Sequence, residues 1–402
     1  MPLHLRALCL IAVAVLGLPT LFAADQTDDT VRFNRDIRPI MSDTCFHCHG
    51  FDAKARKADL RLDIREFALK AGKSGEIAIV PGKPEASEII KRIFTKDEDD
   101  LMPEKASHKT LTPEQKELFR RWVKQGALYE DHWAYTPLKP VAVPPMPAGG
   151  RNPIDAFIGK KLAEKKIMPS AETSKEKLLR RVTLDLTGLP PTPEELAAFL
   201  ADQSPNAYEK QVDRLLASPH YGERMSVWWL DIARYADTVG FHGDQNQRIF
   251  PYRDYVINAF NSNKPFDAFT REQLAGDLLP NSTEEQKVAS GYNRLNMMTR
   301  EGGAQPKEYL AKYGAERVRS VSAAWLGSTF GCAECHDHKF DPIKAADFYT
   351  LQSFFADVKQ WGVYADYSYT PEPELKGVNN DSPFPPEIKT TSPYLQKQDA
   401  RA

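Results

Sequence analysis

Apolar residues recur at helical spacing along most of this chain, in two groups separated by a proline-rich stretch. In the first group, residues 31–41 predict a short helix with Phe33, Ile37, Ile40 and Met41 on its apolar face. Residues 84–93 predict a second helix, which begins at Pro84. Residues 58–63 alternate between apolar and polar side chains and predict either a short strand or an extended turn.

The clearest predicted element is a helix over residues 112–126. Thr112 is a good N-cap, Pro113 suits the first helical position, and Gln115 completes a capping box. Gly126 is expected to end the helix. Its buried stripe would consist of Leu118, Phe119, Trp122 and Val123. We expect this helix to pack across the helix at residues 31–41 and to close a small first domain.

The second group of apolar positions predicts a larger helical domain. Helical periodicity covers residues 155–165, 175–185, 193–200, 207–217, 224–235 and 252–279. The fold class is therefore mainly α. We expect a small domain at 25–135, a Pro- and Gly-rich linker at 136–151, a larger helical domain at 152–363, and a loop-rich or disordered tail at 364–402.

Composition and charge describe a globular protein rather than a nucleic-acid-binding one. Apolar residues make up 42%, charged residues 27%, and the net charge is −2. Residues 1–24 resemble a signal peptide, with a short apolar run before Ala23 and Ala24. A retained membrane anchor is the alternative. We expect an exported, periplasmic mature chain with no integral membrane span and no nucleic-acid partner.

The pattern Cys-X-X-Cys-His occurs twice, as Cys45-Phe46-His47-Cys48-His49 and from Cys332 to His336. Two thiols on one helical turn can each bond a haem vinyl group, and the following histidine can then face the iron. Cys9 would leave with the leader, so the four motif cysteines would be the only ones left. The pattern predicts haem c, one or two per chain, held by Cys45, Cys48, Cys332 and Cys335. A redox pair, a zinc half-site or structural disulfides are the alternatives.

Iron ligands can be assigned more fully at the first motif than at the second. His49 would be the proximal ligand, and Met102, held in an extended loop by Pro103, would be the distal one. A gap-filling core methionine is the alternative for Met102, and His108 is the other candidate ligand. His47 is expected at the surface.

At the second motif His336 would be proximal, and His338 is too close in sequence to reach the opposite haem face. His242, Met297 and Met298 are the distal candidates. An open sixth position is the alternative, and it would favour catalysis over electron transfer alone.

Charged residues gather in the segment before the second motif, but the sequence assigns no catalytic residue. They are either a solvated face or part of a substrate pocket, and they comprise Arg234, Asp237, Asp244, Arg248, Arg253 and Glu301. Trp228 and Trp229 lie in an apolar helix and are expected in the core.

Several segments resemble a known two-domain architecture. Residues 31–127, with Arg35-Asp36-Ile37, the first Cys-X-X-Cys-His and Met102-Pro103, resemble the planctomycete-type cytochrome c domain. Residues 152–362 resemble the uncharacterised domain that commonly follows it, through segments 184–193, 221–224, 233–238, 273–280 and 331–339. The resemblance implies an exported multidomain cytochrome of the kind found in bacteria that degrade complex polysaccharides. Such chains usually continue into a further C-terminal domain, so we expect either a short form or a truncated one.

These observations lead to one functional expectation and three alternatives. We expect an exported multihaem c-type cytochrome that transfers electrons to or from a redox partner protein. It would form part of an oxidoreductase acting on a small-molecule or carbohydrate substrate. The alternatives are a pure electron carrier, a dihaem peroxidase, and a binding or scaffold protein with one haem.

Overall fold

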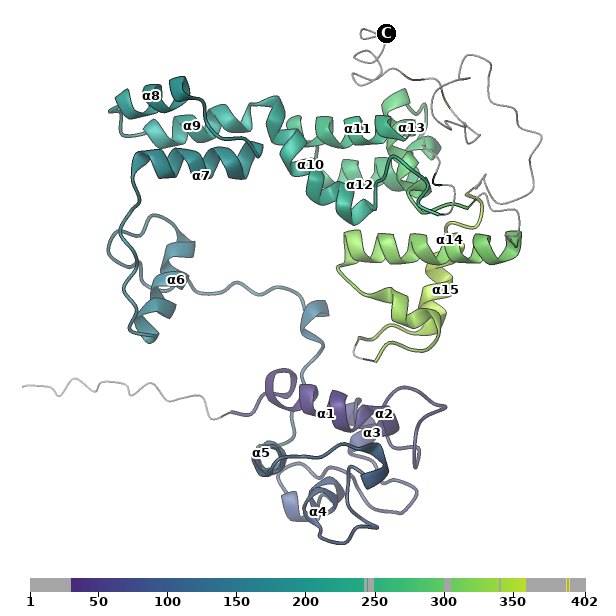
Figure 1. Cartoon of the computed structure of the whole chain (residues 1–402). Helices are drawn as coiled ribbons and strands as arrows, with labels where there is room; N and C mark the ends of the chain where they lie inside the picture. The colour runs from purple at the N-terminus through teal and green to yellow at the C-terminus, as the bar shows by residue number, and fades with distance from the viewer. Residues whose placement is uncertain are drawn as a thin grey trace, which may run out of the picture. The chain divides into compact units, whose positions relative to one another are not determined.

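A computed structural model describes residues 30–241, 244, 249–299, 305–339, 341–358, 388 and 390 (Figure 1). The described chain divides into two compact units between Thr136 and Pro137. Both units are built from helices, and the described residues form no strand, only two isolated β-bridges. The mainly α fold predicted from the sequence is confirmed. No helix within the described residues is long and apolar enough to cross a membrane.

The first unit begins with a helix that confirms the prediction for residues 31–41. A π-helical turn, η1 (Phe33–Ile37), continues directly into α1 (Arg38–Thr44) and then into α2 (Phe46–His49). Ala58 and Asp59 both adopt positive φ angles of 53°, so residues 58–63 form an extended turn and not a strand. The remaining elements of the unit are α3 (Arg65–Ala68), η2 (Pro84–Ala86), α4 (Glu88–Phe94), η3 (Lys105–Ser107), α5 (Pro113–Lys124) and η4 (Trp133–Tyr135).

Helix α5 forms as its sequence predicts. The Thr112 hydroxyl accepts a hydrogen bond from the Gln115 backbone N–H at 3.2 Å, and the Gln115 side chain accepts one from the Thr112 N–H at 2.9 Å. The helix ends at Lys124, and Gly126 follows with a φ of 102°. Trp122 is buried and stacks on Phe33 of η1, with ring centroids 5.6 Å apart. The closing helix therefore packs against the element in front of residues 45–49.

The helix predicted over residues 84–93 is interrupted at Ser87, which has an extended backbone conformation. Its hydroxyl accepts a hydrogen bond from the Val80 N–H at 2.9 Å and donates one to the Lys83 carbonyl at 2.9 Å. This side chain offers the backbone an alternative to the helical ladder, so the segment divides into η2 and α4. The apolar periodicity was correct for Ile89, Ile90 and Ile93, which are buried on α4.

The second unit contains the predicted helices and several that were not predicted. The predicted ones are α6 (Pro153–Glu164), α7 (Lys175–Thr187), α8 (Pro193–Ala201), α9 (Ala207–Leu216), α10 (Pro219–Ala233), α11 (Phe250–Asn261) and α12 (Phe266–Ala275). The elements missed from the sequence are α13 (Glu284–Ala289), α14 (Pro306–Val321), α15 (Ala345–Ser353) and the short turns η5 (Gly276–Leu278), η6 (Ser290–Arg294), η7 (Ser322–Leu326) and η8 (Phe330–Glu334). The periodicity over residues 252–279 predicts one continuing helical region, but a turn with Asn263 at a φ of 48° separates α11 from α12.

Packing in the second unit separates the two adjacent tryptophans of α10. Trp229 is buried, and its indole N–H lies 3.0 Å from the Tyr252 hydroxyl and 2.8 Å from Gln273 Oε1. Trp228 is 61% exposed, with the Arg224 guanidinium 5.6 Å from its ring centroid. The prediction of a core position is therefore confirmed for Trp229 and wrong for Trp228, because α10 turns only the Trp229 side of this pair towards the core.

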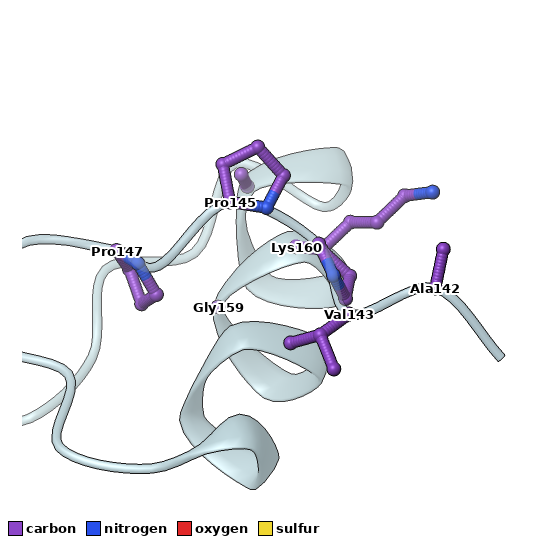
Figure 2. A pocket seen from close by; sticks show the side chains of 8 residues that line it. Ala142, Val143, Pro145, Pro147, Gly159 and Lys160 are labelled. Atoms are coloured by element: carbon purple, nitrogen blue, oxygen red, sulfur yellow. The ribbon is translucent and has the colours of Figure 1, made fainter. Parts of the chain in front are cut away.

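Part of the proline-rich linker packs along α6 (Figure 2). A Cβ atom added to Gly159 would lie 2.7 Å from the Pro147 ring, so the glycine permits this close approach. The shallow groove between linker and helix is lined by Ala142, Val143, Pro144, Pro145, Pro147, Gly159, Lys160 and Ala163. The linker is thus extended, as the prolines predict, but it is also fixed to the first helix of its unit.

Candidate haem-attachment sites

The first Cys-X-X-Cys-His motif forms one helical turn. Cys45 follows α1 and caps α2, which carries the other four residues. The Cys45 carbonyl accepts hydrogen bonds from the His49 N–H at 2.8 Å and from the Cys48 N–H at 3.2 Å. Both thiols are free and half-buried. The two sulfur groups and the imidazole therefore come from the same turn, as thioether attachment of a haem requires.

A returning loop holds this turn in place. The carbonyls of Cys48 and His49 accept hydrogen bonds from the N–H groups of Lys57 and Leu62, at 2.7 and 2.8 Å. Arg56 Nε donates to the Gly50 carbonyl at 2.9 Å. A Cβ atom at position 50 would lie only 2.3 Å from the Phe46 carbonyl oxygen, so the chain can leave the motif this tightly only with glycine.

Burial shifts the pKa values of Cys45 and His49. It raises the pKa of the Cys45 thiol to about 11 and lowers the pKa of His49. The imidazole is therefore held in the neutral form that ligates a metal. His49 Nδ1 is buried without a hydrogen-bond partner, which is costly for a polar atom and marks a group with an unused bonding capacity. Two free thiols beside such an imidazole fit haem c.

The segment that carries Met102 is bound to helix α4. The Met102 N–H donates to the Arg92 carbonyl at 3.1 Å, and the charges of both Arg92 and Glu104 act on the His49 pKa. Met102 itself is half-buried. This arrangement is compatible with Met102 as distal ligand, which stays a prediction. His108 is exposed at a φ of 56°, and His47 is exposed as expected.

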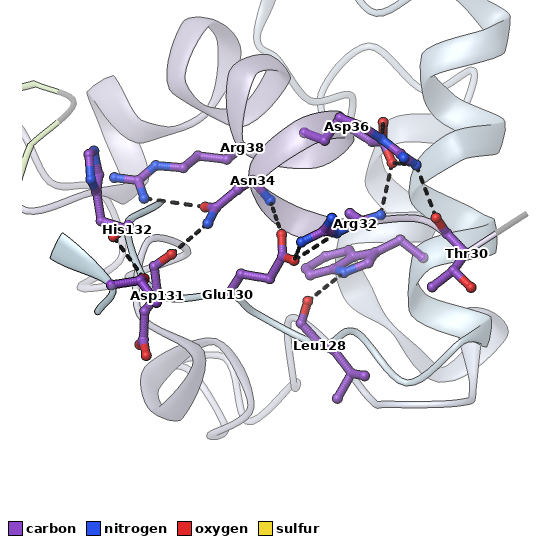
Figure 3. A network of polar contacts seen from close by, with 12 residues as sticks. Thr30, Arg32, Asn34, Asp36, Arg38, Leu128, Glu130, Asp131 and His132 are labelled. Atoms are coloured by element: carbon purple, nitrogen blue, oxygen red, sulfur yellow. Dashed lines mark hydrogen bonds and ion pairs between the residues drawn. The ribbon is translucent and has the colours of Figure 1, made fainter. Parts of the chain in front are cut away.

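Polar contacts join the two ends of the first unit around this site (Figure 3). Glu130 Oε1 accepts two hydrogen bonds from the Arg32 guanidinium, at 2.7 and 2.9 Å, and Oε2 accepts one from the Asn34 N–H at 2.8 Å. The Asn34 amide donates to the Asp131 carbonyl. The Tyr129 hydroxyl donates to the Leu62 carbonyl at 2.8 Å. The chain after α5 is thereby tied both to η1 and to the loop that holds His49.

The second motif has a different setting. Cys332 lies on the 3-10 turn η8, and Cys335 and His336 follow it; all three side chains are exposed. Ala333, between the cysteines, is fully buried in a cluster with Val318 of α14 and Phe348 of α15. His336 Nδ1 bonds to the Asp337 carbonyl at 2.8 Å. A ligating histidine commonly uses one ring nitrogen in this way, and Nε2 would then be the ligand atom. The donor set of the second motif therefore also fits a haem.

His338 supports the loop after the second motif and is 5% exposed. Its Nδ1 accepts a hydrogen bond from the Asp341 N–H at 2.8 Å, and its Nε2 bonds to the Thr329 hydroxyl at 3.1 Å. Both ring nitrogens are thus occupied by structural contacts. This agrees with the prediction that His338 does not ligate the second haem.

The structure describes two of the three distal candidates of the second motif, Met297 and Met298. His242 lies outside the described residues. Met298 is 2% exposed, and its N–H bonds to the Val239 carbonyl at 2.9 Å, so it is a core residue. Met297 is 54% exposed beside Gly240. Among the described residues, no three His, Cys, Asp or Glu side chains are grouped so that they could hold a metal ion.

The charged residues before the second motif pair with near neighbours. Arg234 forms an ion pair with Glu316. Asp237 accepts from the Tyr235 hydroxyl at 2.5 Å, Asp244 accepts from the Gly240 N–H at 2.8 Å, and Arg253 pairs with Asp254 at 3.4 Å. Arg248 and Glu301 lie outside the described residues. These pairings favour a structural role for the described charges over a substrate pocket.

Family models match the two parts of the chain separately. Residues 45–105 match the model described as planctomycete cytochrome C, and residues 153–360 match a model described as a protein of unknown function, DUF1549. The comparisons with curated proteins and with solved structures gave no match. The first match, over the motif with Cys45 and Cys48, implies haem c as cofactor. The chain belongs to the DUF1549 family, and the planctomycete cytochrome C domain in front of that region makes it a c-type cytochrome.

Proposed function

We propose that this chain is an exported cytochrome that carries two covalently attached haems and transfers electrons to or from a redox partner protein. The first motif carries the proposal, since two free thiols and a half-buried imidazole share one helical turn. Attachment of a haem would use the two thiols for thioether bonds and the His49 imidazole as an iron ligand.

At the first centre, each residue has a distinct proposed role. Cys45 and Cys48 attach the haem through thioether bonds, His49 is the proximal ligand, and Met102 is the distal ligand. A haem with this ligand pair exchanges one electron at a raised potential. The loop hydrogen bonds to the Cys48 and His49 carbonyls hold the proximal side rigid. A rigid site suits electron transfer because little rearrangement accompanies the change of oxidation state.

At the second centre, Cys332 and Cys335 attach the haem and His336 is the proximal ligand. If His242 ligates, this centre is a low-potential relay. The exposure of Cys332, Cys335 and His336 favours a second candidate function, in which the sixth position is open. A small molecule or sugar could then be oxidised there, with the first centre as electron exit.

Haem stoichiometry tests the proposal. The full chain is produced in a host with a c-type maturation system, and covalent haem is counted by pyridine haemochrome absorbance and by intact mass. We expect two haems in the wild type, one in C45A/C48A and one in C332A/C335A. A wild type without covalent haem, or a haem count that neither double variant lowers, overturns the proposal. The same preparation tests export, because the mature chain should begin after Ala23 or Ala24.

Carbon monoxide separates relay from catalysis at the second centre. Binding to the reduced wild type that disappears in C332A/C335A supports an open site and the catalytic candidate. Absence of binding in the wild type, with binding gained in His242→Ala, establishes the relay and rejects the open site.

A further inference from the structure

A chain of ion pairs connects the end of α10 to the second Cys-X-X-Cys-His motif. Arg234 pairs with Glu316 of α14, Glu316 pairs with Arg319 one turn later, and Arg319 pairs with Glu334. Glu334 is the residue directly before Cys335. The carboxylate at the end of this ion-pair network therefore belongs to the second motif.

The ion pairs of this network make more contacts than isolated surface ion pairs do. The Glu316 carboxylate uses one oxygen for Arg234 and the other, at 2.5 Å, for Arg319. Arg234 also donates to the Glu316 carbonyl at 3.0 Å. The four side chains are between 32% and 40% exposed, so solvent screens them only in part. A network of this kind fixes its members better than an isolated exposed pair does.

Glu334 is held by its backbone as well as by its side chain. Its carbonyl accepts a hydrogen bond from the Tyr349 hydroxyl at 2.8 Å. The preceding residue, Ala333, is fully buried. Because the turn is held at both residues, the Glu334 side chain stays paired with the Arg319 guanidinium on the residue directly before Cys335.

We propose that Glu334 and Arg319 together set the reduction potential of the second haem, with Arg319 as a positioning residue that acts through Glu334. This inference rests on the proposed second haem. Reduction adds one electron to the iron, and no bond forms or breaks. A carboxylate near the iron stabilises the oxidised form, whereas a guanidinium stabilises the reduced form. In the wild type, the Arg319 guanidinium would offset most of the effect of the Glu334 carboxylate on the reduction potential of the haem.

The two single variants should move the potential in opposite directions. Arg319→Gln leaves the Glu334 charge without its partner, so the potential of the second haem should fall. Glu334→Gln removes the negative charge and leaves Arg319, so the potential should rise. The double variant should return towards the wild-type value. A merely structural role predicts shifts of the same sign, because both single variants break the same ion pair.

The experiment is a spectroelectrochemical titration of the full chain with both haems attached. The first haem is the internal reference, and its potential should stay constant. Arg214→Gln is the matched control, since Arg214 pairs with Glu195 at 2.6 Å with nearly the same exposure, 40% and 31%, on helices away from the motif. This control should leave both potentials unchanged.

The possible outcomes distinguish a failure of this inference from a failure of the proposed function on which it rests. Two haems with opposite shifts in the single variants support the inference. Two haems with no shift, or with shifts of the same sign, overturn the inference and leave the proposed function standing. A wild type without haem at the second motif overturns the proposed second centre and this inference with it.

Discussion

Substituting Gly50 by alanine should destabilise the first unit and loosen its haem-attachment turn. Gly50 is buried directly after His49, where the chain turns away from α2. The new Cβ atom would lie 2.3 Å from the Phe46 carbonyl oxygen and 3.1 Å from Phe46 Cβ. These neighbours belong to the same short helix as the motif, so the strain cannot be relieved by rotating a flexible side chain.

The size of the effect follows from this geometry. An ordinary van der Waals contact to a Cβ atom begins at 3.4 Å, so the overlap with the carbonyl oxygen is about an ångström. Overpacking in a well-packed site costs about 1–3 kcal/mol, and a clash with backbone belongs at the upper end of that range. We therefore expect a loss of about 2–3 kcal/mol, which is about a 30- to 140-fold change in the folding equilibrium.

Denaturant-dependent hydrogen exchange measures the stability of the first unit within the full chain, and it is followed by mass spectrometry on peptides from residues 30–130. Gly72→Ala is the matched control, because its Cβ would meet only the Glu76 carbonyl oxygen, at 3.6 Å. We expect Gly72→Ala to stay near the wild type, and covalent haem at the first motif to fall only in Gly50→Ala. Equal stability of the two variants would refute the reasoning.

Three further variants test other parts of the structure. Met102→His should lower the potential of the first haem by replacing a thioether with a stronger donor to ferric iron, and an unchanged potential and methionine–iron band would contradict the ligation. Glu130→Gln should cost about 1 kcal/mol at neutral pH. Burial opposes ionisation of Glu130, but its hydrogen bonds, including those from Arg32, outweigh burial and lower its pKa below 4.5. The contribution of Glu130 to stability is therefore complete above that pH and is lost as the pH falls below it. In an acid titration, the free energy of unfolding should decline less steeply in the variant than in the wild type. Tyr252→Phe removes a hydroxyl that donates to Gln273 at 2.5 Å within the second core, and should cost about 1–2 kcal/mol in denaturant unfolding, whereas no loss would contradict the contact.

Capping side chains made the start of two helices predictable, although the capping box of Thr283 and Gln286 at α13 was not recognised. Thr112 and Thr192 each form a capping box with the residue three positions later, and the helices begin as the sequence indicates. Helix α14 was missed although Tyr313, Val318 and Val321 are buried on it, because polar residues interrupt the apolar pattern of the same face. Arg317 and Ser320 are 6% and 4% exposed on that helix, so polar residues occupy positions that a hydrophobic pattern counts as surface.

The sequence was enough to predict which residues form the first candidate site, but not which other segments contact it. The spacing of Cys45, Cys48 and His49 requires one helical turn, and local sequence is enough to form it. The loop that caps this turn depends on contacts from Lys57 and Leu62, which follow no local pattern. The ion pairs that reach Glu334 are of the same kind, since they join residues up to 82 positions apart.

The same five-residue pattern occupies two different environments in this chain, and the difference bears on how the two centres would work. At the first motif, Phe46 lies between the cysteines and is 6% exposed, and the His49 imidazole is half-buried. At the second, a small residue, Ala333, anchors the turn and the ligand atoms face solvent. A partly buried centre whose turn is held by backbone hydrogen bonds would suit electron transfer, because its surroundings would change little with oxidation state. An exposed centre needs another way to fix its potential, and the ion-pair chain ending at Glu334 is the feature of this structure that would supply it.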